Sequence, residues 1–303
     1  MAGGKPFFKQ NEIPLHLMLL PGLLLTFIFG YLPLAGLTVA FQRFIPARGL
    51  FGKQPWVGLY NFELIFSMPN TPNVIRNTVV IAFGKIVLGL LIPIIVTLLL
   101  NELGSNKAKR TIQTIIYFPY FISWIVFAAL LLDLLSPSTG LVNKFTGFFG
   151  FEPIFFLGDN RYFQGTMIIT DVIKSFGYGT VVYMAAITGI DPNLYEAAEI
   201  DGAGRWRQTL HITLPGLQMV IVLMMVLSLG NVLNAGFDQI FNMYNSYVYE
   251  TGDIIDTMMY RLGIVEAMYG PSTAMGFLKS IVSLVFISTS YYIAYKLFDY
   301  RIF

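Results

Sequence analysis

Six long apolar stretches dominate the sequence, and their length most limits the fold. Each approaches or exceeds the roughly 20 residues that a helix needs to cross the hydrocarbon core of a bilayer. Only 12% of the 303 residues are charged and 55% are hydrophobic, which is too apolar for an ordinary soluble domain. Unpaired backbone groups are costly in lipid, so we expect helices. The expected spans are residues 14–40, 74–101, 112–135, 163–190, 216–236 and 274–297.

These features predict an all-α, polytopic membrane protein, a single domain over residues 1–303 with six transmembrane helices. No linker or low-complexity tract marks a second domain. The first span follows Lys5 and Lys9 but is longer than the apolar core of a signal peptide, so we expect it to be retained. Cysteine is absent, and the two histidines, His16 and His211, are far apart in the sequence, so no metal site is expected.

Basic residues in the short connections predict the orientation. Lys107, Lys109 and Arg110 form a tight group between the second and third spans, which favours the cytoplasmic side for that connection. The cations of the opposite side are spread over longer loops. Both termini, and the connection between the fourth and fifth spans, are therefore expected to face the cytoplasm.

Two connections on the outer side are long. Residues 41–73 mix aromatic and polar side chains, as a segment at the headgroup level does. Residues 237–273 carry apolar positions at helical spacing and predict a short amphipathic helix outside the membrane. This helix either packs on the bilayer surface or helps to receive a soluble binding protein.

A polar segment at 191–215 separates the fourth span from the fifth and contains EAAEIDGAGRWRQTLHITLP. Asp191 can accept hydrogen bonds from free amides, and Pro192 suits the first helical position, so a helix is expected to begin here. Gly202 and Gly204 permit a turn into a second helix at an angle. The segment therefore predicts a helix, a glycine break and a second helix.

The side chains of this segment suit a contact with another protein. Ala197 and Ala198 allow close approach of a partner surface, and Glu196 lies where a carboxylate suits the helix dipole or a cation on the partner. Trp206 is expected to pack the segment against the bundle, although a contact with a partner is an alternative. Leu214 and Pro215 are expected to lead into the fifth span.

This spacing resembles the EAA loop of the permease subunits of binding-protein-dependent type I ABC importers. Segments such as GLYNFELIF and YFPYFISWIV are similar to the carbohydrate-uptake branch, and within it to permeases for oligosaccharides. The resemblance implies a cytoplasmic coupling helix that docks into an ATPase subunit. The residues to which it assigns this role are Glu196, Ala197, Ala198, Gly202, Ala203, Gly204, Arg205, Leu214 and Pro215.

The resemblance also implies the partners. They are a second permease, most simply a different chain, two ATP-binding subunits and an extracytoplasmic solute-binding protein, assembled in the inner membrane of a bacterium. The sequence has no GxxxxGK[ST] motif, so ATP and Mg²⁺ are expected on the ATPase subunits. No catalytic residue, cofactor or metal is expected in this chain.

Ionisable residues inside spans are costly and usually face the interior of a bundle, so they are candidates for a solute path. Asp171 and Lys174 are three residues apart and are expected to neutralise each other, which leaves Lys85 and Lys279 as unpaired cations. Three lysines against one aspartate favour an acidic oligosaccharide such as a uronate oligomer. Aromatic and amide side chains that suit a sugar are Tyr178, Tyr183, Asn231 and Asn234.

Two other functions are possible for a chain with several apolar spans. A membrane-embedded enzyme needs clustered acids, bases or metal ligands, and the sequence has no HExxH and no paired intramembrane aspartates. An ATP-independent secondary transporter often has inverted repeats with broken helices. Gly89 and Pro93 interrupt the second span, but no matching break recurs three spans later.

Overall fold

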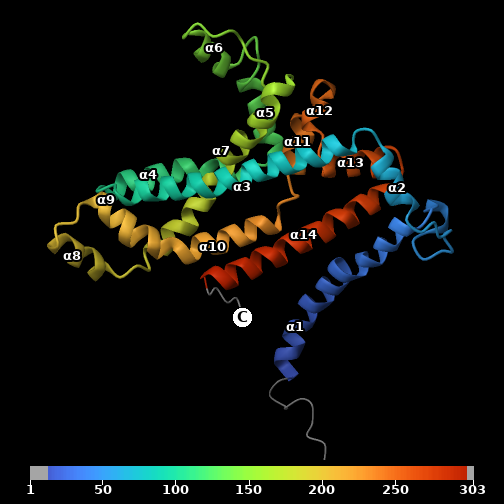
Figure 1. Ribbon diagram of the computed structural model, residues 1–303, viewed down its shortest axis with the longest axis horizontal. Coiled ribbons are helices and arrows are strands. Elements are labelled where there is room, and N and C mark those ends of the chain that lie inside the picture. The colour runs from blue at the N-terminus through green and yellow to red at the C-terminus, as the bar shows by residue number, and fades with distance from the viewer. Residues whose placement is uncertain (1–12, 299–303) are drawn as a thin grey trace, which may run out of the picture.

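The computed structural model describes residues 13–298, and their elements are helices without a strand. Four helical stretches are long and apolar enough to cross a membrane: Pro14–Phe41, Thr71–Asn101, Arg205–Gly230 and Tyr269–Ile293. A bent pair, Asn106–Phe121 and Trp124–Leu134, is a further candidate. Most of the long helices lie along one bundle, with α8 (Pro192–Ile200) at one end and α2 (Tyr60–Ser67) at the other, whereas α1 (Ile13–Thr26) and α6 (Leu141–Gly147) project from it (Figure 1). The all-α membrane fold is therefore confirmed. The termini and residues Lys5, Lys9 and Arg301 lie outside the described part.

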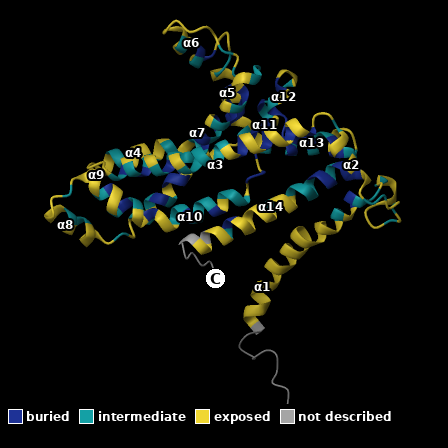
Figure 2. Cartoon of the chain, viewed as in Figure 1, coloured by how far each residue is buried: buried dark blue, intermediate teal, exposed yellow. Residues whose placement is uncertain are grey.

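The first span stands apart from the bundle. It consists of α1 (Ile13–Thr26), η2 (Phe27–Tyr31) and η3 (Leu32–Phe41). None of its most apolar window is buried, and only Val39 and Ala40 near its end are covered by the rest of the chain. Figure 2 shows this helix as an almost wholly exposed arm. Its apolar surface therefore has to meet lipid or another protein.

The centre of the bundle is the pair α3 (Thr71–Asn101) and α7 (Asn160–Ile187). Gly179 permits their close approach, because a Cβ there would lie 2.8 Å from Pro93 Cγ. Helix α7 is the predicted fourth span, 163–190. It is long enough to cross a bilayer but less apolar than the four stretches above, because it carries Asp171 and Lys174.

The third span is broken. Residues 112–135 were expected to form one helix, but α4 (Asn106–Tyr117) and η5 (Phe118–Phe121) meet α5 (Trp124–Leu134) at 105°. Ser123 begins the new helix by accepting a hydrogen bond from Val126 N at 3.4 Å. Pro119 has no amide hydrogen, and the break leaves carbonyls that lipid cannot satisfy. Lys174 Nζ donates to one of them, Tyr120 O, at 3.0 Å.

The fifth span begins earlier and ends earlier than the expected 216–236. Helix α9 (Arg205–Gln208), the π-turn η6 (Thr209–Thr213) and α10 (Leu214–Gly230) form one apolar stretch. Pro215 costs little, because it lies in the first turn of α10, next to the π-turn. Residues 231–236 are not helical, and Gly236 takes a φ of +90° that favours glycine.

The expected surface helix in 237–273 is instead a set of short helices packed into the protein. They are α11 (Phe237–Met243), η7 (Ser246–Val248), α12 (Tyr249–Gly252), α13 (Ile255–Tyr260) and η8 (Arg261–Val265). Ile240, Ile254 and Met258 are buried. The apolar periodicity was correctly identified, but it faces the core and not the bilayer surface. The last span, α14 (Tyr269–Phe298), follows.

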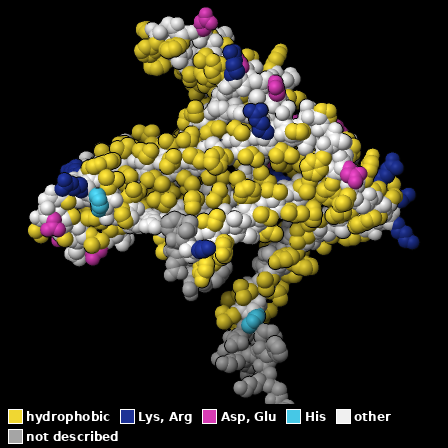
Figure 3. All heavy atoms as spheres, in the orientation of Figure 1, with side chains coloured by type: hydrophobic (Ala, Val, Ile, Leu, Met, Phe, Trp, Pro, Cys, Tyr) yellow, Lys and Arg dark blue, Asp and Glu magenta, His cyan; other side chains and the backbone are white. Residues whose placement is uncertain are grey.

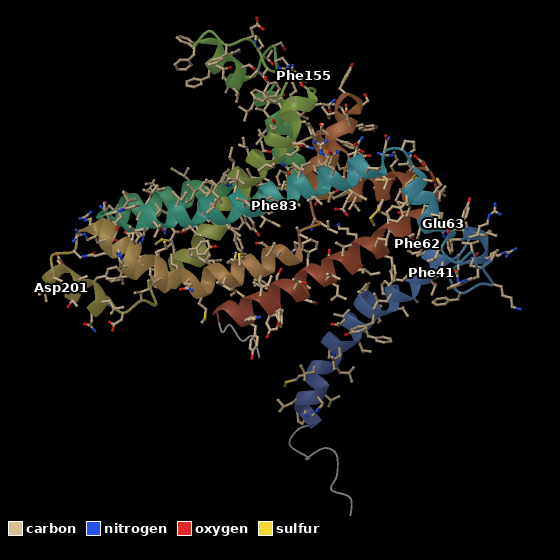
Figure 4. All side chains as sticks on the ribbon, viewed as in Figure 1. Phe41, Phe62, Glu63, Phe83, Phe155 and Asp201 are labelled. Carbon is tan, nitrogen blue, oxygen red and sulfur yellow. The ribbon has the colours of Figure 1, made fainter. Side chains whose placement is uncertain are left out.

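The remaining connections are η4 (Pro46–Arg48), α2 (Tyr60–Ser67) and α6 (Leu141–Gly147). In residues 41–73, Trp56 stacks on Phe41 with ring centroids 5.5 Å apart, and Phe41 also meets Phe62 (Figure 4). These rings cover the end of the first span and join it to α14 through Phe277.

Candidate coupling loop and solute cavities

The segment 191–215 forms a helix, a turn and a second helix, as the sequence indicates. Asp191 caps α8 (Pro192–Ile200) by accepting a hydrogen bond from Asn193 N at 3.0 Å. Gly202 takes a φ of +77°, and Ala203 N donates back to Ala198 O at 2.8 Å, which ends the helix. Gly204 has an ordinary φ of −68°. Only Gly202 of the two glycines is therefore required by the backbone.

This loop is anchored at its base. The Tyr195 hydroxyl lies 2.9 Å from Thr213 Oγ1, which ties α8 to the turn before α10. Glu102 at the end of α3 lies 3.8 Å from Arg205 Nη1 and accepts a hydrogen bond from Thr209 at 3.5 Å. The ion pair is solvent-exposed and weak. The contacts nevertheless fix the loop against two spans.

The tip of the loop is free for a partner. Asp201 marks it in Figure 4, beyond the end of the bundle. Glu196 and Ala197 are exposed, and so are Ile200 and Trp206, at 87% and 72%. The expectation that Trp206 packs against the bundle is wrong, because its ring points away from the packed helices. The acidic Glu196 and the apolar Ile200 and Trp206 are thus exposed together on the projecting loop.

Two cavities lie along the bundle and share Asn231 and Asn234. The larger has a volume of about 860 Å³ and is lined mainly by α13 and α14, including Asp256 and Lys279. The smaller, of about 350 Å³, is lined by Lys85, Asp171 and Gly236 among others. The non-helical residues 231–236 therefore lie between two hollows, and the side chains of Asn231 and Asn234 line both.

Each lysine of these cavities is paired. Lys85 Nζ lies 3.3 Å from Asp171 Oδ1 and donates to Ala235 O at 2.7 Å and to Gln239 Oε1. Lys279 Nζ donates to Asp256 Oδ1. The expectation that these two lysines are unpaired is therefore wrong.

The pairing of Asp171 with Lys174 is wrong as well. Lys174 turns to the broken third span, where its Nζ lies 5.6 Å from the Tyr120 ring centroid and 5.2 Å from that of Trp124. Tyr120 and Trp124, from the two halves of the broken span, therefore take the place of Asp171 as neighbours of Lys174. An i,i+3 pair contributes only a few tenths of a kcal/mol, which tertiary contacts easily exceed.

The two tyrosines lie outside both cavities. Tyr178 stacks on Tyr120 at 4.6 Å between centroids. Tyr183 is buried, and its hydroxyl has no hydrogen-bond partner among the described residues. Of the eight residues expected along a solute path, five line the cavities: Lys85, Asp171, Asn231, Asn234 and Lys279. Asp256 was missed, because it lies in a connection and not in a span.

A third hollow of about 360 Å³ lies near the α2 end of the bundle. Arg261 forms a two-point ion pair with the buried Asp253, at 2.6 Å and 3.1 Å. Hydrogen bonds from Arg261 to Asp253 raise the pKa of the guanidinium above its usual range. The pair ties Asp253, which follows α12, to the first residue of η8, which is a structural role. Within residues 13–298 no three histidine or acidic side chains gather as metal ligands.

Residues 89–303 match the family model of the binding-protein-dependent transport system inner membrane component. The chain belongs to this family. The permease is 38% identical over 282 residues to the polygalacturonan/rhamnogalacturonan transport system permease protein YteP of Bacillus subtilis, covering 93% of this chain and 88% of that protein. It is 39% identical to protein LplB of the same organism over the same shares.

A solved structure extends the likeness to the fold. The chain superposes on a bacterial ABC transporter involved in the import of the acidic polysaccharide alginate, with a TM-score of 0.88 and 35% identity, covering 95% of this chain and 97% of that one. These relatives place the permease in the carbohydrate-uptake branch of ABC importers.

Proposed function

We propose that this permease is a translocation subunit of an ATP-driven importer, and that the loop 191–215 transmits the work of the ATPase. The observation that carries the proposal is the projecting helix–turn–helix, anchored to α3 and α10 at its base and exposed at its tip. Two separate ATPase subunits bind ATP and Mg²⁺. Glu196, Ala197 and the neighbouring turn of this chain dock into the surface of one of them, and its movement reaches the spans through α8 and α9.

The coupling proposal is tested on the complex purified through a tag on this chain and reconstituted with its binding protein. Sugar-stimulated ATP hydrolysis is measured for Glu196→Lys and Gly202→Ala, with Gly204→Ala as the matched control. An alanine at the left-handed Gly202 costs about 1 kcal/mol or more, whereas the φ of Gly204 admits a side chain. We expect Gly202→Ala and Glu196→Lys to lose stimulation and Gly204→Ala to retain it.

The alternative, a secondary transporter, gives a different result. In that case no ATPase copurifies and uptake proceeds without ATP. Equal effects of the two alanine substitutions would also count against the proposed role of the turn.

The solute is an acidic oligosaccharide that passes along the two cavities. Lys85 and Lys279 line one cavity each, and each is held by an aspartate. A uronate carboxylate can pair with a lysine in place of the aspartate. Asn231 and Asn234 can donate hydrogen bonds to sugar hydroxyls and accept hydrogen bonds from them. The named substrates of YteP, and of the solved alginate importer, are acidic polysaccharides, which supports this assignment.

Charge recognition is tested with one oligosaccharide in two forms. Galacturonate oligomers are compared with the same oligomers after methyl esterification, which removes the charge and keeps the sugar. We expect Lys279→Met to weaken uptake of the free acid much more than uptake of the ester. Equal losses for both forms would refute a role of Lys279 in recognising carboxylates.

The proposed assembly has two permeases in the inner membrane, two ATPases on its cytoplasmic side and a binding protein on its outer side, with both termini of this chain in the cytoplasm. A solved alginate transporter in complex with a pentasaccharide-bound periplasmic protein supports the last partner, with a TM-score of 0.87 and 34% identity. The unburied first span supplies a surface for the second permease. Native mass spectrometry of the complex distinguishes a second copy of this chain from a different permease.

A further inference from the structure

Helix α6 displays an apolar stripe that no other part of residues 13–298 covers. Leu141, Phe145, Phe148 and Phe149 recur at the spacing i, i+4, i+7 and i+8, so they share one face of the helix and the turn after it. All four are exposed, Phe148 at 91%. Phe145 and Phe149 meet edge to face at 5.3 Å between centroids. The stripe is therefore an ordered aromatic surface.

The segment that carries the stripe is built to hold it in place. Asn143, on the opposite face of α6, is only 5% exposed, and its amide donates to Ser136 O at 3.1 Å and to Ile154 O at 3.0 Å. Its oxygen accepts from Ile154 N at 2.8 Å. One buried side chain thus joins both ends of the connection across α6. The amide of Asn143 therefore turns inward, while the phenylalanine rings and Lys144 are exposed.

The surroundings of the stripe are those of a bilayer surface. Residues 139–151 contain a single charged residue, Lys144. The connection leaves α5, half of the broken third span, whose Ile125, Leu132 and Leu134 are exposed as lipid-facing residues are. Apolar side chains are therefore exposed on both α5 and α6, with the exposed Asp133 and the polar residues 136–139 between them. Figure 1 shows α6 beyond α5 and to the side of the bundle, and in Figure 3 hydrophobic side chains gather on this projection.

We propose that the stripe of α6 lies in the lipid surface on the side of the membrane opposite to the coupling loop, and anchors the broken third span there. The position follows from connectivity, since α6 joins the third span to the fourth and the loop 191–215 joins the fourth to the fifth. Aromatic side chains are favoured at this depth, and an amphipathic helix binds there with its apolar face inward. A lipid occupant needs neither a complementary charge nor a shaped pocket, and the stripe offers neither.

The absence of cysteine makes the test direct, since a single thiol can be introduced into this subunit. Phe148→Cys is labelled with a nitroxide in the complete importer, with cysteine-free partner subunits, in vesicles of phosphatidylethanolamine and phosphatidylglycerol. Collisions with oxygen, which concentrates in lipid, are compared with collisions with a water-soluble nickel chelate. Thr139→Cys, exposed just before α6, is the matched control. Both positions are exposed, so neither label disturbs the packing.

We expect the label at 148 to meet oxygen severalfold more readily, relative to nickel, than the label at 139. Equal accessibility to nickel at the two positions would place the stripe in water and overturn the proposal. Protection from both reagents would identify a protein partner instead, as would a change on adding the binding protein. The test does not depend on the identity of the sugar or on ATP hydrolysis, so it can fail while the proposed transport function stands.

Discussion

Lys85 is the side chain whose removal should cost this bundle most among the cavity residues. It is 9% exposed and satisfies three acceptors at once: Asp171, the carbonyl of Ala235 and the amide oxygen of Gln239. Ala235 belongs to the non-helical residues 231–236, so Lys85 also holds the segment that separates the two cavities. Lys85→Met keeps most of the volume and removes the charge.

The loss of unfolding free energy in Lys85→Met depends on the Asp171 carboxylate, which is left without its partner. Removing one partner of a buried ion pair typically costs about 3–5 kcal/mol, because the other charge stays buried. Asp171 is 26% exposed toward a cavity, so water relieves part of this cost and the lower value applies, about 3 kcal/mol. The double substitution Lys85→Met with Asp171→Leu removes the stranded carboxylate as well. It should recover about 2 kcal/mol of that loss, since apolar replacements of buried pairs are often tolerated.

The assay is reversible unfolding of the purified subunit in mixed micelles with increasing sodium dodecyl sulfate. Lys107→Met, at an exposed lysine of α4, is the control and should change the free energy of unfolding by less than about 0.5 kcal/mol. The reasoning is refuted if Lys85→Met costs as little as this control. It is also refuted if the two substitutions of the pair add without coupling, because neighbours in one network are expected to couple.

Two further substitutions test the packing. Gly177→Ala should destabilise the subunit by about 1–3 kcal/mol, because its Cβ would lie 2.1 Å from the backbone oxygen of Ile116. Gly165→Ala on the same helix, with nothing within 4 Å, is the control, and equal unfolding midpoints would contradict the close crossing. Tyr183→Phe should raise the free energy of unfolding by about 1 kcal/mol by removing a buried hydroxyl without a partner, and leave uptake unchanged. A loss of uptake would return Tyr183 to the solute path.

The spans were predictable from apolar length alone, but their breaks were not. Hydropathy does not reveal the turn at Ser123, because α4 and α5 together pass as one apolar span although α4 is the more polar half. Pro119 in FPYF was an available signal for that break. The early start of the fifth span at Arg205 was hidden by its charges, because a helix can leave the membrane without ending.

The ends of the coupling loop followed from local chemistry. Asp191, Pro192 and Gly202 determine the backbone only of nearby residues. The helix cap and the left-handed turn can therefore be predicted from the sequence. The partners of Lys85 and Lys279 were not visible, because they come from other helices and from a connection. Long-range pairing depends on how helices are placed beside one another, and no residue spacing encodes it.

The isolated first span has a consequence for how the transporter is put together. Lipid chains are as apolar as leucine, so an apolar helix in a bilayer gains nothing from the hydrophobic effect by joining its own bundle. The stretch Pro14–Phe41 is held at its end, where Val39 and Ala40 are buried and Phe41 packs on Phe277 of α14, and its most apolar window is unburied. The position of this helix in the complex is therefore determined by the neighbouring helix that packs closely against it. We expect this helix to determine which permease pairs with this chain. Substitutions in it can then change the partner without disturbing the fold.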